Sequence, residues 1–371
     1  MSGYYQIPTK IRFYTSTLLW CYATGQIKSI DATNLNASEE ELYDALLIDP
    51  SKIPLNEIIP GSEIVFELYD DAPDILPEDL NGTGHRRYFY EMFKFDYSMF
   101  LGHNFKEAKL YQTFNAHDVI EDTISPEFSQ RNIVNGCTSY PPSYNGFSIN
   151  EIVNSHSSDK TGKLQLNFHS DESEHLNYGQ LGALMVGNVW DSPVNCDVSA
   201  SVQYNYGSKQ KKTVSGKTIS KMNYYKTNKW LLDPWQLESE FSDTRGVNRP
   251  TRSGVRSWRV SFSLFDFKYA MNQWNFINKD IGFQTQTGYS ETNSDVSQYS
   301  ILNSIDFYTM VVNRSLESHL PFVIQIDATD SSGNLTNRNA DTFAIVRMKD
   351  YKISQTNPKF AKISMTLEEQ V

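Results

Sequence analysis

Alternation of apolar and polar residues marks the final stretch of this chain, from Arg252 to Val371, and it constrains the fold more than any other feature. The apolar positions are Trp258, Val260, Phe262 and Leu264 in one segment and Ala361, Ile363, Met365 and Leu367 in another. The polar positions between them are Arg259, Ser261, Ser263, Lys362, Ser364, Thr366 and Glu368. Successive side chains of a strand point to opposite faces, so one row is expected on a core and the other toward water or a neighbouring subunit. No catalytic constellation accompanies these strands, which favours a protein that packs or binds.

The length of the chain allows two domains. It has 371 residues, whereas one domain commonly takes roughly 100–200 residues. The pattern of residue types along the chain changes between Ser192 and Asp197, so we predict domains at residues 1–195 and 196–371. Aromatic residues make up 13% of the chain, which suits half-buried sheet surfaces and subunit interfaces.

Local patterns in the N-terminal half predict strands and one helix. Residues 10–22 are too short and too polar for a signal peptide and are expected to form a buried first strand. Ser38 and Glu41 fit a capping box, so a short helix is expected over residues 38–48. Residues 86–111 are rich in aromatic side chains and predict a pair of strands.

Further along, residues 181–190 predict an apolar strand. Gly182 and Gly187 within it indicate a close approach of another backbone or a bulge. Residues 207–221 are mostly Lys, Ser, Thr and Gly, which favours a mobile loop. Their lysines match no nucleic-acid groove, because no aromatic residues are interleaved with them.

The C-terminal half also contains a helical stripe. Its apolar positions are Ile301, Ile305, Tyr308, Val312 and Leu316. Spacings of three and four residues place them on one face of a helix, which we expect to pack on a sheet. Pro321 then precedes a predicted central strand at 322–327.

Charge and cysteine content narrow the functional classes. The formal net charge is −11 and the pI about 5.2, which opposes binding to nucleic acid or to an anionic membrane. The cysteines, Cys21, Cys137 and Cys196, have no metal-binding or redox spacing, so reduced thiols and intracellular assembly are expected. No stretch approaches the ~20 apolar residues of a membrane span.

One polar cluster could carry chemistry. It comprises His169, Asp171, Glu172, Glu174 and His175. Imidazoles and carboxylates bind divalent metals, so a metal-dependent hydrolase is one hypothesis, but a solvated turn between strands is the favoured interpretation. His103, at a predicted strand end, is interpreted as structural. The chain has no nucleophile elbow, P-loop or dinucleotide fingerprint, so we predict no catalytic, metal or cofactor residues.

Tryptophans offer a second kind of candidate site. Trp190, Trp230, Trp235, Trp258 and Trp274 could form a platform on which sugars stack. Tryptophan is also an ordinary anchor of cores and interfaces, and that is the favoured interpretation for each of them.

Five segments resemble β-rich tail and baseplate structural proteins of marine tailed bacteriophages. They are MFLGHNF at Met99–Phe105, GQLGALMVGNVW at Gly179–Trp190, RSGVRSWRVSFSLF at Arg252–Phe265, HLPFVIQID at His319–Asp327, and the strand pair at Phe343–Leu367. The first two are similar to strands of the jelly-roll, galactose-binding-like module of such proteins. The resemblance covers roughly half of the chain and has no counterpart between residues 113 and 163.

The resemblance implies a mainly β protein with a jelly-roll-like sandwich at 1–195. At 196–371 it implies a tail-tube or distal-tail-like sandwich or barrel with one packed helix. The implied function is a non-enzymatic structural subunit of the virion tail or baseplate, assembled in the host cytoplasm. Its partners would be other tail or baseplate subunits and copies of itself in a ring, where sheet edges pair. The alternative is a carbohydrate-binding module that recognises a host-surface glycan through its loops.

Overall fold

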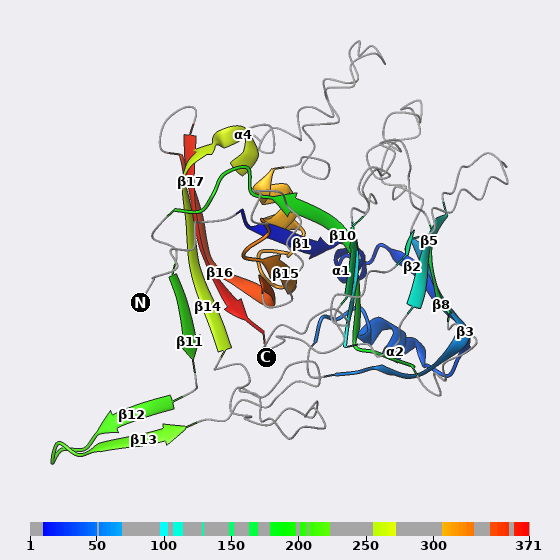
Figure 1. Ribbon diagram of the computed structural model, residues 1–371, viewed down its shortest axis with the longest axis horizontal. Helices are drawn as coiled ribbons and strands as arrows, with labels where there is room; N and C mark the ends of the chain where they lie inside the picture. The colour runs from blue at the N-terminus through cyan, green and yellow to red at the C-terminus, as the bar shows by residue number, and fades with distance from the viewer. Residues whose placement is uncertain are drawn as a thin grey trace, which may run out of the picture.

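The computed structural model describes residues 10–49, 52–68, 97–102, 107–113, 128–129, 148–151, 163–169, 179–197, 201–205, 208–222, 255–271, 306–329, 342–355 and 360–370. Within them the protein is mainly β, as the sequence predicted, and every strand pairing is antiparallel. Figure 1 shows a large curled sheet, a smaller sheet and a hairpin that projects from the body.

The larger sheet has nine strands in the order β11-β14-β17-β16-β15-β1-β10-β4-β7. Their bounds are β1 Arg12–Ser16, β4 Tyr97–Leu101, β7 Ser148–Glu151, β10 Ala183–Asp191, β11 Ser201–Asn205, β14 Val255–Asp266, β15 Phe322–Gln325, β16 Phe343–Gln355 and β17 Phe360–Glu369. Because β15 has strands on both sides, the central strand predicted at 322–327 is confirmed, although it ends at Gln325.

The smaller sheet has the order β2-β3-β8-β5-β6, and β9 lies beside β3. Its strands are β2 Ile27–Leu35, β3 Leu55–Leu68, β5 Glu107–Thr113, β6 Phe128–Ser129, β8 Lys163–His169 and β9 Gly179–Leu181. Helix α2 (Glu39–Asp44) connects β2 to β3 and begins with the predicted capping box. The Ser38 amide donates to Glu41 Oε2 at 2.7 Å, and the Glu41 amide donates to Ser38 Oγ at 3.3 Å.

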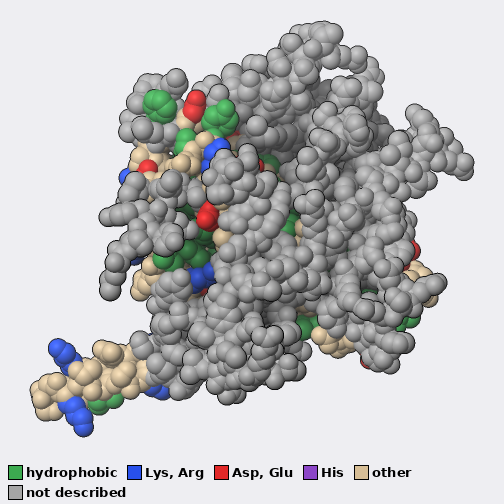
Figure 2. All heavy atoms as spheres, in the orientation of Figure 1, with side chains coloured by type: hydrophobic (Ala, Val, Ile, Leu, Met, Phe, Trp, Pro, Cys, Tyr) green, Lys and Arg blue, Asp and Glu red, His purple; other side chains and the backbone are tan. Residues whose placement is uncertain are grey.

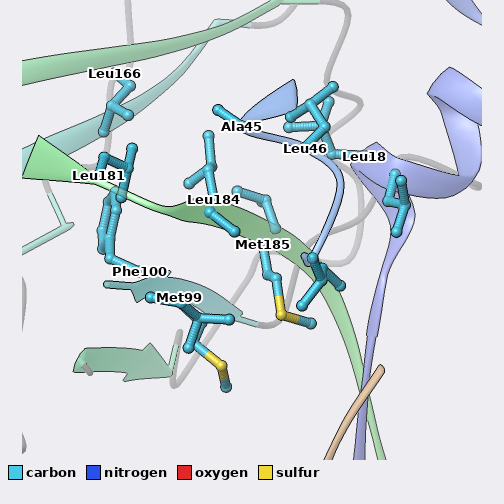
Figure 3. Packing of buried hydrophobic residues seen from close by; sticks show 14 of the residues in the cluster. Leu18, Ala45, Leu46, Met99, Phe100, Leu166, Leu181, Leu184 and Met185 are labelled. Atoms are coloured by element: carbon cyan, nitrogen blue, oxygen red, sulfur yellow. The ribbon is translucent and has the colours of Figure 1, made fainter. Parts of the chain in front are cut away.

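A first hydrophobic core fills the space between the two sheets. The smaller sheet contributes apolar side chains from β2, β3, β8 and β9, and the larger sheet contributes side chains from β4, β10 and their neighbours. Figure 3 shows part of this core, where Leu18 of α1 (Thr17–Ala23) and Leu46 beside α2 pack near Leu184 and Met185 of β10. This arrangement is a β-sandwich.

A second core lies on the other face of the larger sheet, in the hollow of its curl. The inward row of β14 and that of β17 line it, so the alternation predicted for Trp258 to Phe262 and for Ala361 to Leu367 is confirmed. The π-helix η6 (Tyr308–Asn313) and the short helix α4 (Phe267–Ala270) pack into the same core. Figure 1 shows η6, in gold, inside the curled sheet.

The strands in the middle of the larger sheet are buried on both faces. Along β15, Val323 points to the first core while Phe322 and Ile324 point to the second. In β1, Tyr14 points to the first core and Phe13 points to the second. Burial on both faces explains why β15 begins with the continuous apolar run Phe322-Val323-Ile324 rather than with an alternating pattern.

The sequence prediction was wrong at the first strand. Residues 10–22 are not one strand, because β1 ends at Ser16 and α1 begins at Thr17. The Ser16 hydroxyl accepts a hydrogen bond from the Leu19 amide at 3.1 Å, which caps the new helix. A cap of this kind offers the backbone a local alternative to a strand ladder.

Two further expectations need correction. The aromatic segment 86–111 does contain two strands, but they do not pair with each other: β4 joins the larger sheet and β5 the smaller one. The helical stripe is confirmed only within η6, because Leu316 has a left-handed backbone with a φ of 48° and lies beyond the end of the π-helix. Residues 301–305 of that stripe lie outside the described chain.

The larger sheet contains strands from both sides of the predicted boundary at residue 195. The strand β1 pairs with β15 from Arg12 to Tyr14. Phe13 contributes to the second core, and Phe343 contributes to the first. The described parts of the two halves therefore share one sheet and two cores, whereas their independence as domains stays a prediction. No helix in the described residues is long and apolar enough to cross a bilayer.

Candidate functional site

The predicted histidine and carboxylate cluster falls largely outside the described residues. His169 ends strand β8, but its side chain, residues 171–175 and His103 are not described. Among the residues that the structure does describe, no group of three or more His, Cys, Asp or Glu side chains could hold a metal ion. The favoured solvated turn therefore stays a prediction, and the metal-dependent hydrolase stays its alternative.

Two of the five tryptophans proposed for a sugar platform are buried. Trp190 is 5% exposed and meets Phe13 and Phe307 edge-on, with ring centroids 5.6 Å and 5.2 Å apart. Trp258 is 8% exposed and packs in the same core. Both are core anchors, because a stacking platform must face solvent. The remaining three, Trp230, Trp235 and Trp274, lie outside the described chain.

The only buried thiol in the described chain is unsuited to nucleophilic chemistry. Burial raises the pKa of Cys21 to about 12, although Arg314 opposes this shift. Burial likewise lowers the pKa of Arg314 to about 10, and its guanidinium lies 4.7 Å from the ring centroid of Trp20. Because the thiolate is the reactive form of cysteine, the neutral Cys21 serves packing.

A buried ion pair joins three strands at the rim of the second core. Arg256 Nη2 of β14 lies 2.8 Å from Glu369 Oε1 of β17 and donates to the Phe343 carbonyl of β16 at 3.1 Å. The Arg256 amide also donates to Glu369 Oε2 at 2.9 Å. The carboxylate side chain has no exposed area, so its charge is balanced within the protein. This site stabilises the sheet and offers no open position to a ligand.

Unlike these buried groups, a charged hairpin on the surface extends away from the body of the molecule. It consists of β12 (Ser208–Lys212) and β13 (Thr218–Met222), and we call residues 208–222 the lysine hairpin. Figures 1 and 2 show it extending from the edge of the larger sheet, next to β11. The prediction of a mobile loop at 207–221 was wrong, because these residues pair from Ser208↔Met222 to Lys212↔Thr218.

The register of the lysine hairpin sorts its side chains onto two faces. Directly opposed residues of an antiparallel pair share a face, as do residues two positions apart in a strand. Lys209 opposes Lys221, and Lys211 opposes Ile219. These four residues form what we call the lysine face. The other face carries Gln210, Ser220, Lys212 and Thr218.

The turn of the lysine hairpin is tightly hydrogen-bonded. The Thr213 amide donates to the Lys217 carbonyl at 2.8 Å, and the Gly216 amide donates to the Thr213 carbonyl at 2.9 Å. Gly216 has a φ of 81°, a left-handed conformation that favours glycine. The Thr213 hydroxyl also accepts a bond from the Lys217 amide at 3.0 Å. These contacts give the hairpin a defined turn and set the register of its two strands.

The edge of the larger sheet beside the hairpin is the second surface feature. In the described chain β11 pairs only with β14, so its other side presents backbone groups that have no strand partner there. The side chains of Ser201, Val202 and Gln203 are exposed. An edge of this kind can pair with a strand of another chain. Edge and hairpin together form a candidate assembly surface.

Comparison with protein-family models, with curated proteins and with solved structures finds no match to this chain.

Sequence reasoning missed both the hairpin and the buried ion pair, although each left a signal. A turn sequence, Thr-Val-Ser-Gly at 213–216, separates two segments of matching length. Arg256 and Glu369 continue the inward rows of β14 and β17, where the neighbouring positions are apolar. A charge in an inward row requires a partner, so these two positions pointed to each other.

Proposed function

We propose that this chain is a non-enzymatic structural subunit that assembles through its sheet edges, and that its place is a bacteriophage tail or baseplate. The observation that carries the assembly role is the edge of the nine-stranded sheet at β11. The placement in a tail or baseplate is supported by the sequence resemblance of five segments, most of which form core strands.

The exposed edge strand favours assembly for a physical reason. A strand with unpaired backbone groups and an exposed β-branched residue is an aggregation hazard in a monomer, and proteins commonly blunt it. Val202 is 48% exposed on β11. Pairing with a neighbouring copy satisfies the backbone groups and covers this side chain. If the edge of one copy meets a different surface of the next, the contact generates a ring or a filament.

The test is the mass of the purified protein together with its appearance in electron micrographs. We expect closed oligomers whose population rises with concentration, and we expect labelled antibodies to mark the tail of intact virions. The variant Val202→Lys places a charge on the edge strand and is expected to shift the protein toward monomer.

Ile59→Lys is the matched control for this variant. Ile59 is 43% exposed on β3, an internal strand of the smaller sheet, so the same substitution there leaves a sheet edge unchanged. A monomer at all concentrations would contradict the assembly role. Labelling away from the virion would contradict the tail or baseplate placement.

A further inference from the structure

We propose that the lysine face of the β12–β13 hairpin docks onto the acidic surface of a second copy of this chain. The inference deepens the proposed function and rests on it, because it assigns a partner to the hairpin beside the assembly edge. Three observations carry it: the charge of the hairpin against that of the chain, the preformed turn, and the position next to β11.

The charge of the hairpin is opposite to that of the molecule. Its lysines are Lys209, Lys211, Lys212, Lys217 and Lys221, and it contains no Asp or Glu. The whole chain carries a formal net charge of −11, so the rest of the molecule is more acidic still. Opposite fields of this kind steer association and fix its register. A second copy therefore offers the hairpin a complementary surface.

The lysine face is unfavourable in an isolated molecule. Lys209 and Lys221 stand directly opposite each other, and like charges in this arrangement destabilise a strand pair. In the described chain neither ammonium group forms an ion pair, and the side chains of both are exposed. Ile219 lies next to Lys221 on the same face, opposite Lys211, and is 55% exposed. Carboxylates of a partner would relieve the repulsion while the contact covers the isoleucine.

The form of the hairpin fits a docking role. An isolated two-stranded ribbon is marginal in water, so such an arm gains stability when it lies against another surface. The Thr213–Lys217 hydrogen bonds and the left-handed Gly216 fix its turn before any contact forms. Docking then costs little conformational entropy. Val214 at the tip is fully exposed and can enter the contact as well.

The position of the hairpin points to a neighbour rather than to its own body. It follows β11 directly in the chain and extends away from the sheet (Figures 1 and 2). A five-residue strand spans about 17 Å. A copy paired at the β11 edge would therefore lie within reach of the lysine face.

Nucleic acid is the competing partner for a basic ribbon. A two-stranded ribbon can enter a major groove, and lysines can contact phosphates. The hairpin, however, has no arginine and no aromatic residue for base contacts. The acidic remainder of the chain would also repel a polyanion. The observations therefore favour an acidic protein surface, that of a second copy.

The first experiment measures self-association of the full chain by sedimentation. Lys209→Glu/Lys221→Glu reverses two charges on the lysine face, and we expect it to raise the dissociation constant about tenfold or more. Lys212→Glu/Lys217→Glu is the matched control: it changes the net charge of the hairpin equally but leaves the lysine face intact. We expect its effect to be about threefold or less, since it acts through long-range attraction only. Unchanged circular dichroism and melting would show that both variants fold.

The second experiment identifies the partner. Isotopically light and heavy copies are mixed and treated with a zero-length carbodiimide cross-linker, which joins a lysine to a carboxylate in contact with it. We expect mixed-isotope peptides that link Lys209 or Lys221 to Asp or Glu residues.

The outcomes separate the two proposals. An oligomer that is equally tight in both double variants, or cross-links confined to single copies, would overturn the docking and leave edge assembly standing. A protein that stays monomeric would overturn both. Binding to a short DNA duplex that Lys209→Glu/Lys221→Glu abolishes would replace the second copy with nucleic acid as the partner.

Discussion

Gly187 of β10 leaves room for the backbone of β1 to come very close at the point where β1 ends. It pairs with Ser16, the residue at which the chain leaves the strand and enters α1. A Cβ atom at position 187 would lie 2.0 Å from the Thr15 carbonyl oxygen and 2.5 Å from the Thr17 amide nitrogen. Backbone atoms cannot rotate away as a side chain can. The close approach that the sequence predicted for this glycine is therefore confirmed, and its cause is the turn into the helix.

We expect Gly187→Ala to destabilise the protein strongly. The new methyl group must push β1 away from β10 or displace α1 from the first core, at a cost of about 3 kcal/mol. Chemical denaturation measures the loss as a lower midpoint. Gly61→Ala is the control: Gly61 has a φ of 82° and nothing lies within 4 Å of its Cβ position, so only backbone strain of about 1 kcal/mol is expected. Equal losses in the two variants would contradict the steric explanation.

The strands differ in how far their sequences could predict them. Those of the second core alternate, and the inward rows from Trp258 to Phe262 in β14 and from Ala361 to Leu367 in β17 were predicted, because one face of each is apolar and the other polar. The side chain of Leu264, which was also predicted to face inward, lies outside the described part, and the register of β14 shifts after Phe262. The helix α2 was predicted from its own cap. The division at Ser16 was not predicted, because it depends on the Ser16 cap of α1 together with the close approach that Gly187 of a distant strand allows.

The sequence also could not predict which strands pair with each other. The strands β4 and β5 are neighbours in the chain but join different sheets, because the side chains of β4 fill a core made largely by distant segments. Local patterns determine which residues face inward, and they do not determine against which strand those residues pack. For the same reason the charge of the lysine hairpin was visible in the sequence, while its lysine face required the register of β12 and β13.

The Arg256–Glu369 pair predicts an energetic contrast between two neighbouring residues of β17. Glu369→Ala leaves a buried guanidinium without its counter-charge, and we expect a loss of about 3–5 kcal/mol in the free energy of unfolding. Glu368 pairs with Lys349 at 3.2 Å on the solvent side, where the two side chains are 50% and 59% exposed. Glu368→Ala is therefore expected to cost less than about 1 kcal/mol.

Urea denaturation of the two alanine variants tests this contrast. Both substitutions remove a glutamate that pairs with a cation on an adjacent strand, so they differ mainly in burial. The double variant Arg256→Met/Glu369→Leu removes both charges and is expected to recover part of the loss seen in Glu369→Ala. A loss of similar size at Glu368 would show that burial does not govern the strength of these pairs.

The two halves of the chain are interlocked through the larger sheet. Strand β1 lies between β15 and β10, so a strand from residues 1–195 is held by one from residues 196–371. Phe13 and Trp190 of the first half complete the second core, while Val323 and Phe343 of the second half complete the first. Each side chain contributes roughly 1.5–3 kcal/mol when buried, so the sum is comparable to the ~5–15 kcal/mol that stabilises a whole domain.

This interlocking predicts how the chain behaves when it is divided at the boundary that its sequence indicated. We expect residues 1–195 and 196–371, expressed separately, to lack a cooperative melting transition and to be digested rapidly by protease, because each half exposes an unpaired central strand and its apolar partners. Coexpressed halves are expected to co-purify through a tag on either one and to melt together, with the intact chain as the reference. Two soluble halves that each unfold cooperatively would show instead that the boundary separates independent domains, and that the shared sheet is a contact between them.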